Sequence, residues 1–341
     1  MKTVFVGLSG GVDSSVSAAL LKEQGYKVVG VYMKNWSQNL PGMECPWAED
    51  LADAKRVAVK LGIDLLIFDF ETEYKKKVVD YMLAEFKKGR TPNPDIMCNQ
   101  EIKFKLFYEV ARERGADLIA TGHYARTDGE KLLRAVDENK DQTYFLYRIS
   151  KEAISRTLFP VGGMYKPDVK KLAEKYGLHN AYKKESMGVC FVGEVGMKDF
   201  LRQYFPEKPG EIRDAETGAV LGYHEGAIFY TVGQRHGLEI GGGLPYYVVK
   251  KAVEQNIVYV SKNLTNAELW TDELELRDII LREESEQVQV RLRHRAALIP
   301  AKLQGNKLIF KEKIKRPAAG QSAVLYGGED NQVCLGGGII K

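Results

Sequence analysis

The chain has 341 residues, of which 44% are hydrophobic and 28% charged, and its formal net charge is +4. This is ordinary for a globular protein of two or three domains, and so modest a charge does not by itself indicate nucleic-acid binding. No run approaches the roughly 18 apolar residues of a membrane span, and Met1 leads almost directly into a strand-like segment, so we expect a cytoplasmic location and no signal peptide. The four cysteines form no C-x-x-C pair, which argues against a zinc site.

Short apolar segments alternate with helical patterns over the first 125 residues. The predicted strands are Thr3–Leu8, Lys27–Met33, Asp64–Phe70 and Asp117–Thr121, and the predicted helices are Val12–Gln24, Trp47–Leu61, Tyr74–Lys88 and Gln100–Arg114. The strands barely alternate, as strands buried on both faces of a parallel sheet do, and Gly25, Gly62 and Gly115 stand where helices end. We therefore predict a doubly wound α/β domain over residues 1–205.

The composition and the predicted secondary structure change in the second half of the chain. Two more helices are predicted at Gln142–Leu158 and Pro167–Tyr176, but from Pro209 glycine becomes frequent and short alternating strands replace helices. This predicts a small β-rich central domain over residues 206–263. Strands such as Val288–Leu292, Lys307–Phe310 and Ser322–Leu325 then predict a C-terminal antiparallel β-barrel over residues 264–341.

A glycine-rich turn, Gly7–Ser14, ends the first predicted strand and opens a helix. Gly10 and Gly11 let backbone N–H groups approach an anion, and the helix N-terminus adds partial positive charge. No lysine follows, so this is not a Walker A loop. The S-G-G-x-D-S pattern instead resembles the PP-loop of ATP pyrophosphatases, which implies an adenine nucleotide alpha-hydrolase-like fold that cleaves ATP to AMP and pyrophosphate. An aspartate beside phosphates, Asp13, implies Mg²⁺ to offset the repulsion.

Two cysteines lie in distinctive surroundings. Cys98 follows a proline-stiffened segment and precedes the helix predicted from Gln100, a position that favours the thiolate. Asp95, three residues earlier, is close enough to handle a proton. Cys190 lies between two glycines, as a loop that can swing would place it. Each cysteine could instead be a buried apolar residue.

Six separated segments, in order along the chain, resemble the tRNA-specific uridine thiolases (the MnmA/TrmU type). They read GRTPNPDIMCNQEIKF, TGHYAR, NKDQTYFLY, ESMGVCFVGE, TVGQRHGL and GQSAVLY, and the resemblance covers essentially the whole chain. It implies ATP-dependent 2-thiolation of the wobble uridine in the tRNAs for lysine, glutamate and glutamine. It also implies a partner, a desulfurase or relay protein, that donates sulfur as a persulfide.

The same resemblance implies a mechanism and a set of contacts. ATP would adenylate the C2 oxygen of a flipped-out uridine. Cys190 would carry the persulfide, and attack by Cys98 would leave a Cys98–Cys190 disulfide or released sulfide, with Asp95 as acid, base or orienting group. The implied ATP contacts are Gly7, Leu8, Ser9, Gly10, Gly11, Val12, Asp13, Ser14, Met33 and Gly122. The implied tRNA contacts are Asn93, Pro94, Asp95, His123, Lys140, Asp141, Gln142, Arg293, His294 and Gln321, although His123 could also be a packed histidine.

Residues 287–320 carry nine lysines and arginines but a single acidic residue, Glu312. Arginines at 291, 293 and 295 recur at period two, which predicts three guanidinium groups on one face of one strand, and lysines at 311, 313 and 315 repeat that spacing. Such a face suits an RNA phosphate backbone, although a solvated strand face is the alternative.

Three other interpretations stay open. Cys45, Cys98 and Cys190 could hold an iron–sulfur cluster with one open iron site; otherwise Cys45 is incidental. Cys334, in the terminal strand, is expected to be packed. A PP-loop ligase for small molecules would need neither loop cysteine nor a basic barrel. A non-catalytic RNA-binding protein would not need an intact phosphate loop together with Asp95 and both cysteines.

Overall fold

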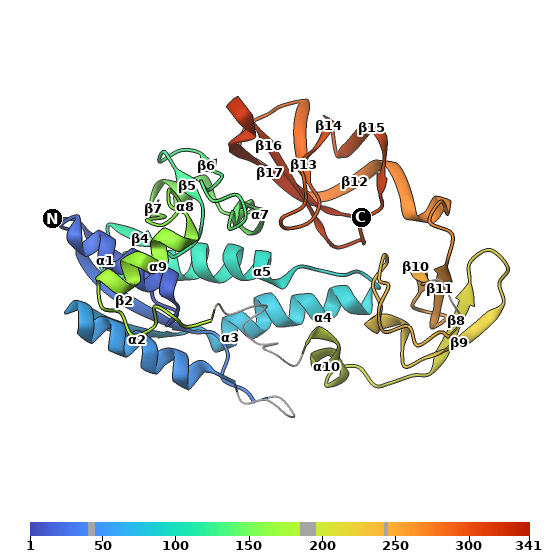
Figure 1. Cartoon of the computed structure of the whole chain (residues 1–341), viewed down its shortest axis with the longest axis horizontal. Helices are drawn as coiled ribbons and strands as arrows, with labels where there is room; N and C mark the ends of the chain where they lie inside the picture. Colours follow the sequence, from blue (N-terminus) through green and yellow to red (C-terminus); the bar gives the residue numbers. More distant parts are fainter. Residues whose placement is uncertain (40–44, 185–195, 242–244) are drawn as a thin grey trace. The chain divides into compact units, whose positions relative to one another are not determined.

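The computed structural model describes residues 1–39, 45–184, 196–241 and 245–341 (Figure 1). The chain forms two compact units, each made of separate segments. The first unit comprises Met1–Val79, Pro94–Val195 and Tyr326–Gly336, and the second comprises Asp80–Asn93, Gly196–Leu325 and Gly337–Lys341. In the described part of the chain, no helix is both long and apolar enough to cross a bilayer.

A five-stranded parallel sheet forms the centre of the first unit, in the order β3-β2-β1-β4-β7. Its strands are β1 (Thr3–Gly7), β2 (Lys27–Lys34), β3 (Asp64–Asp69), β4 (Leu118–Ala120) and β7 (Thr157–Leu158). Val4 and Val6 of β1 are fully buried, as a strand covered on both faces requires. The doubly wound α/β prediction is confirmed. The strand order reverses beside β1, and in such sheets ligands bind at the carboxyl ends of the strands at this point.

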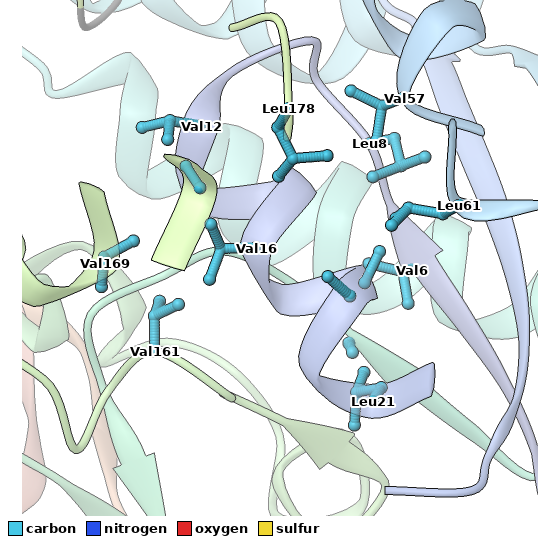
Figure 2. Packing of buried hydrophobic residues seen from close by; sticks show 14 of the residues in the cluster. Val6, Leu8, Val12, Val16, Leu21, Val57, Leu61, Val161, Val169 and Leu178 are labelled. Atoms are coloured by element: carbon cyan, nitrogen blue, oxygen red, sulfur yellow. The ribbon is translucent and has the colours of Figure 1, made fainter. Parts of the chain in front are cut away.

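Three helices contribute to a hydrophobic cluster with β1: α1 (Val12–Glu23), α2 (Trp47–Leu61) and α9 (Lys166–Lys175). Figure 2 shows Val12 and Val16 of α1 facing Val169 of α9, with Val57 and Leu61 of α2 on the other side of the cluster. Each valine or leucine buried there contributes roughly 1.5–3 kcal/mol. The packing fixes the start of α1, and with it the turn that follows β1.

Two predicted helices begin earlier than their sequence patterns suggest. One helical run comprises α3 (Glu71–Tyr74), the π-helical segment η1 (Lys75–Val79) and α4 (Asp80–Lys87); the other comprises α5 (Pro94–Met97), the π-helical segment η2 (Cys98–Leu106) and α6 (Phe107–Glu113). The second run starts at Pro94 because the fixed φ of proline suits a first helical turn, where no N–H is needed. The prediction that Cys98 precedes its helix is therefore wrong: Cys98 lies inside it.

The single helix predicted over Gln142–Leu158 is also wrong. The structure has α7 (Thr143–Leu146), α8 (Lys151–Ser155) and then strand β7. Ser150 interrupts the helix because its hydroxyl accepts a bond from the N–H of Ala153, 3.1 Å away, and so caps a new one. A short hairpin, β5 (Arg126–Thr127) and β6 (Leu132–Leu133), completes the first unit.

The second unit begins with α10 (Met197–Arg202) and a four-stranded sheet of order β10-β11-β8-β9. The strands are β8 (Gly210–Asp214), β9 (Val220–His224), β10 (Tyr247–Ala252) and β11 (Ile257–Ser261), with single 3₁₀ turns at Ala227–Phe229, Ala267–Leu269 and, in the first unit, Glu329–Asn331. The register of β10 against β11 shifts between Val248 and Lys250, which makes Val249 an extra, bulged residue.

Six further strands close into the predicted barrel. They are β12 (Trp270–Leu281), β13 (Gln287–Arg291), β14 (Ile299–Gln304), β15 (Lys307–Lys315), β16 (Ser322–Gly327) and β17 (Val333–Ile340), in the order β12-β15-β14-β13-β16-β17, and β12 pairs with β17 as well. Closure leaves the barrel without an open edge.

The prediction of three arginines on one strand face is wrong. Strand β13 ends at Arg291, which is only 5% exposed, and Arg293 and Arg295 lie in the turn that follows. The turn is sharp, since Arg295 has a φ of +64°. The lysines at 311, 313 and 315 do lie on β15, and all three are exposed.

Candidate active site

The glycine-rich turn after β1 lies where the strand order of the first sheet reverses. Gly10 has a φ of +78°, and a Cβ there would lie 2.5 Å from the carbonyl oxygen of Asp50. A Cβ on Gly122, just after β4, would lie 2.5 Å from the backbone N of Ser14. Met33 packs closely on Gly7, since a Cβ on Gly7 would lie 3.0 Å from its Cε. Only glycine therefore fits at positions 10 and 122, which brings the end of β4 against the start of α1.

Hydroxyl groups hold the turn in shape. The Oγ atoms of Ser9 and Ser14 lie 3.2 Å apart, and the hydroxyls of Ser14 and Ser15 donate to the carbonyl of Gly11 at 3.1 and 2.8 Å. Ser14 and Ser15 are buried, whereas Ser9 is exposed at the rim. The turn is thus pre-organised, with the N-terminus of α1 at its centre, which is the arrangement that suits a phosphate.

A buried lysine supplies the positive charge that the sequence of this turn lacks. Nζ of Lys166, the first residue of α9, lies 2.6 and 2.8 Å from the carboxylate oxygens of Asp13. The hydroxyl of Tyr124 donates to the same carboxylate at 3.0 Å. Lys166 is only 6% exposed. The sequence does not predict Lys166 and Tyr124 as site residues, because no local pattern marks a lysine at a helix start as a partner of Asp13.

Asn180 ties a later part of the chain to the phosphate turn. Its side-chain amide donates to the carbonyl of Gly10 at 2.8 Å and to Oγ of Ser15 at 2.9 Å. The residue is buried, and its Oδ1 has no hydrogen-bond partner among the described residues. No local pattern in the sequence predicts Asn180 as a site residue.

Lys183, three residues on, anchors the same segment to α2. Its ammonium lies 2.8 Å from Asp50 and 2.6 Å from Asp53, and His179 Nε2 lies 2.8 Å from Asp53. Burial acts to raise the pKa of Asp53, but the bonds from Lys183 and His179 outweigh it, and the pKa lies below its usual range. This segment leads into residues 185–195, so the predicted sulfur carrier, Cys190, lies outside the described residues.

Cys98 and Asp95 lie about one turn apart on the helical run that starts at Pro94. Cys98 is a thiol and only 3% exposed, and Asp95 is half-buried. Burial raises the pKa of the Asp95 carboxyl, and the charge of Lys103 acts against that rise. A carboxyl whose pKa is moved towards neutrality is suited to proton transfer. Lys103 is a further residue of this region that no local sequence pattern predicts.

His123 lies just beyond β4 as a neutral imidazole. Its Nδ1 lies 2.8 Å from the hydroxyl of Thr121, and its ring centroid lies 5.5 Å from that of Phe104. Burial, reinforced by the charge of Lys103, lowers the pKa of His123 well below its usual value. These contacts are those of a packed histidine whose Nδ1 is engaged in a hydrogen bond.

The predicted tRNA contacts at 140–142 have differing exposures. Asp141 is only 1% exposed, and its carboxylate accepts bonds from Thr143 Oγ1 at 3.0 and 2.9 Å. Gln142 exchanges bonds with the backbone of Tyr124 in both directions, at 2.9 and 2.8 Å. Lys140 is half-buried. Asp141 and Gln142 therefore support the backbone around Tyr124 and Thr143.

The other predicted tRNA contacts fall in both units. Asn93, Arg293, His294 and Gln321 belong to the second unit, whereas Pro94 and Asp95 belong to the first. Arg293 is exposed, and His294 is half-buried. The side-chain amide of Gln321 donates to the carbonyl of Thr91 at 2.6 Å.

Of the three cysteines in the iron–sulfur alternative, the structure describes two. Sγ of Cys45 donates to the carbonyl of Trp36 at 3.5 Å, and burial raises the pKa of its thiol. Outside residues 40–44, 185–195 and 242–244, no cluster of three His, Cys, Asp or Glu side chains could hold a metal ion. Cys334 is buried, as expected for the terminal strand.

Comparison with known proteins extends this local picture to the whole chain. Residues 2–194 match the family model described as the tRNA methyl transferase HUP domain, 198–262 the tRNA methyl transferase PRC-barrel domain, and 265–340 the aminomethyltransferase beta-barrel domain. The tRNA-specific 2-thiouridylase MnmA of Idiomarina loihiensis is 49% identical over all of this chain and 96% of its own length. Its namesakes from Bacillus licheniformis and Listeria welshimeri are 46% and 45% identical, each over 99% of this chain and 94% of their own. The chain therefore belongs to the tRNA-specific 2-thiouridylase MnmA family.

Proposed function

We propose that this protein is a tRNA-uridine 2-sulfurtransferase, which uses ATP to replace the C2 oxygen of the wobble uridine with sulfur. The observation that carries the proposal is the phosphate turn, with Asp13 paired to Lys166, in a chain that matches 2-thiouridylases from end to end. Membership of the family supports tRNA thiolation in general. The wobble position and the tRNAs for lysine, glutamate and glutamine are finer parts of the proposal.

The phosphate turn is proposed to hold the triphosphate of ATP. The contacts would come from the backbone of Gly7–Ser14, with Met33 and Gly122 bordering the adenine side. When bound, ATP supplies the adenylyl group that makes the C2 oxygen a good leaving group. Mg²⁺ bound with ATP would offset repulsion between the phosphates and Asp13. The ammonium of Lys166 would hold the Asp13 carboxylate in place and add positive charge beside the turn.

The sulfur step is proposed to use both loop cysteines. The terminal sulfur of a persulfide on Cys190 attacks C2 and forms the new C–S bond, while AMP leaves with the former C2 oxygen. The thiolate of Cys98 then attacks the inner persulfide sulfur, which breaks the S–S bond to the transferred atom and leaves a Cys98–Cys190 disulfide. Asp95, whose pKa is raised by burial, would exchange protons with Cys98 or the base. A desulfurase or relay protein would load Cys190.

A thiolation assay tests this proposal. Unmodified tRNA is incubated with ATP, Mg²⁺ and labelled sulfide or a desulfurase, using anaerobically purified protein of known iron content. Labelled 2-thiouridine formed only with ATP, and without iron, would support the persulfide route. Activity that tracks iron content would favour a cluster on Cys45, Cys98 and Cys190 instead, and no labelled tRNA in either case would refute the proposed function.

A further inference from the structure

A cavity of about 240 Å³ lies wholly within the second unit. Its walls come from β10, from the chain between β15 and β16, and from the end of β17. Four cationic side chains line it, Lys250, Lys251, Arg316 and Lys341, and no aspartate or glutamate is among its described lining residues. A hollow lined by cations, without a carboxylate in its described lining, is an arrangement that suits an anion.

The bulge in β10 explains how neighbouring residues of one strand reach the same cavity. In a regular strand, successive side chains point to opposite faces. The extra residue Val249 breaks this alternation, and Val249, Lys250 and Lys251 all line the cavity. The bulge thus brings two lysines to one place.

Lys251 is the most constrained of these cations. It is half-buried, and its ammonium donates to the carbonyl of Tyr230 at 2.8 Å. No carboxylate contacts it among the residues that the structure describes. Burial lowers the pKa of Lys251 to about 8, as expected for an ammonium removed from water without a counter-charge. An anion in the cavity would supply that missing partner.

Arg316, which is exposed, also has no carboxylate partner among the described residues, whereas Lys341 has one. The guanidinium of Arg316 donates to the carbonyls of Glu268 and Trp270 at 3.1 and 3.2 Å, which orients the group but leaves its charge unneutralised. Lys341 already pairs with Glu275 at 2.5 Å. Arg316 and Lys251 are therefore two cations that backbone carbonyls orient and no carboxylate in the described part of the chain neutralises. Apolar side chains such as Leu274 and Pro317 form the adjoining wall of the cavity.

We infer that this cavity binds a phosphate group, with Lys251 and Arg316 as its main contacts. The two sources of that chemistry are a backbone phosphate of an RNA and free phosphate or a small phosphate ester. An RNA phosphate is favoured because the exposed lysines of β15, in the same unit, offer further contacts to a polyanion; this choice rests on the proposed function. The site would add a fixed contact to the exposed lysines of β15.

The test for RNA compares Lys251→Met with Lys251→Arg, which keeps the charge. Lys55→Met is the matched control, because it removes one charge from the exposed face of α2. Labelled unmodified tRNA is titrated by fluorescence anisotropy at several salt concentrations. Lys251→Met should weaken binding roughly tenfold at low salt and lower the slope of log K against log salt by about 1. Lys251→Arg and Lys55→Met should bind like the parent protein.

A second arm separates free phosphate from RNA. The Tm is measured in inorganic phosphate and in chloride of equal ionic strength. Phosphate should raise the Tm of the parent protein and of Lys251→Arg but not of Lys251→Met. If phosphate protects while the tRNA affinities of all variants agree, the site takes the free anion. If Lys251→Met matches the parent in both arms, the inference is overturned.

Failure of the cavity inference can be distinguished from failure of the proposed function. Thiolation that persists in the parent protein, with Lys251→Met unaltered in both binding arms, removes the cavity inference alone. A parent protein that neither binds nor thiolates tRNA refutes the proposed function, and the phosphate arm still decides whether the cavity binds an anion.

Discussion

Lys166 Nζ lies 2.6 Å from Oδ1 of Asp13, although 153 residues separate the two in the chain. Lys166 begins α9 and Asp13 lies in the first turn of α1, and the two helices pack together through Val16 and Val169 (Figure 2). A Walker A loop carries its phosphate lysine in its own sequence. Here the tertiary fold brings the lysine to the turn.

Replacing Lys166 with methionine should impair both stability and ATP use. The Asp13 carboxylate would lose its counter-charge, which should destabilise the protein by roughly 1–3 kcal/mol. Pyrophosphate release in the presence of tRNA should fall on the order of 100-fold. Chemical unfolding and a pyrophosphate assay would measure the two effects.

The double variant Asp13→Asn with Lys166→Met serves as the control for that experiment. It removes both charges, so most of the lost stability should return while activity stays low. Parent-level pyrophosphate release by Lys166→Met would contradict a role for this lysine at the phosphates.

Replacing Cys98 or Cys190 with serine should abolish thiolation and leave ATP binding intact. Serine keeps nearly the same size but cannot form the disulfide or attack a persulfide effectively. Cys334→Ser is the matched control, because Cys334 is equally buried but lies in the terminal strand. Labelled sulfur in tRNA and ATP binding by calorimetry are the measurements. Thiolation retained by Cys190→Ser would refute its assignment as the persulfide carrier.

Replacing Lys183 with methionine should slow sulfur transfer more than ATP binding. Lys183 pairs with Asp50 and Asp53 and so anchors the segment that leads to Cys190. We expect a several-fold loss in the rate of thiolation, with the Kd for ATP changed less than twofold, as for a residue that positions another. Lys171→Met, which breaks an exposed pair with Asp168 on α9, is the control. Equal losses in both quantities would instead indicate a general role in holding the phosphate turn.

Local patterns in the sequence were enough to predict the parallel sheet, the phosphate turn and the barrel. Strand β1 and the turn after it depend on neighbouring residues, namely an apolar run followed by Gly10 and Gly11, so they can be read directly. Helix α2 was predicted with its observed bounds, because an amphipathic pattern ends in a left-handed glycine, Gly62.

The rest of the site depends on contacts that are distant in sequence or on unusual local geometry. Lys166 and Asn180 contact the phosphate turn only because α9 and the segment that follows it pack against α1. Cys98 lies within a helix because Pro94 starts that helix, although prolines are more often read as helix breakers. The period-two arginines looked like a strand because a turn with a positive φ at Arg295 is not encoded by a glycine there.

The affinity for phosphate should depend on pH through Lys251. The pKa of its ammonium is lowered to about 8, so the charge is present below that pH and is lost as the pH rises through it. Lys250, Arg316 and Lys341 also line the cavity, and a phosphodiester does not titrate in this range. Affinity for tRNA should therefore fall between about pH 7 and pH 9, by at most about tenfold per unit above the pKa. The Lys251→Arg variant should show a flat profile over the same range, because a guanidinium stays charged. Anisotropy titrations at fixed ionic strength would measure both profiles, and a parent profile as flat as that of the arginine variant would show that Lys251 does not contact the phosphate.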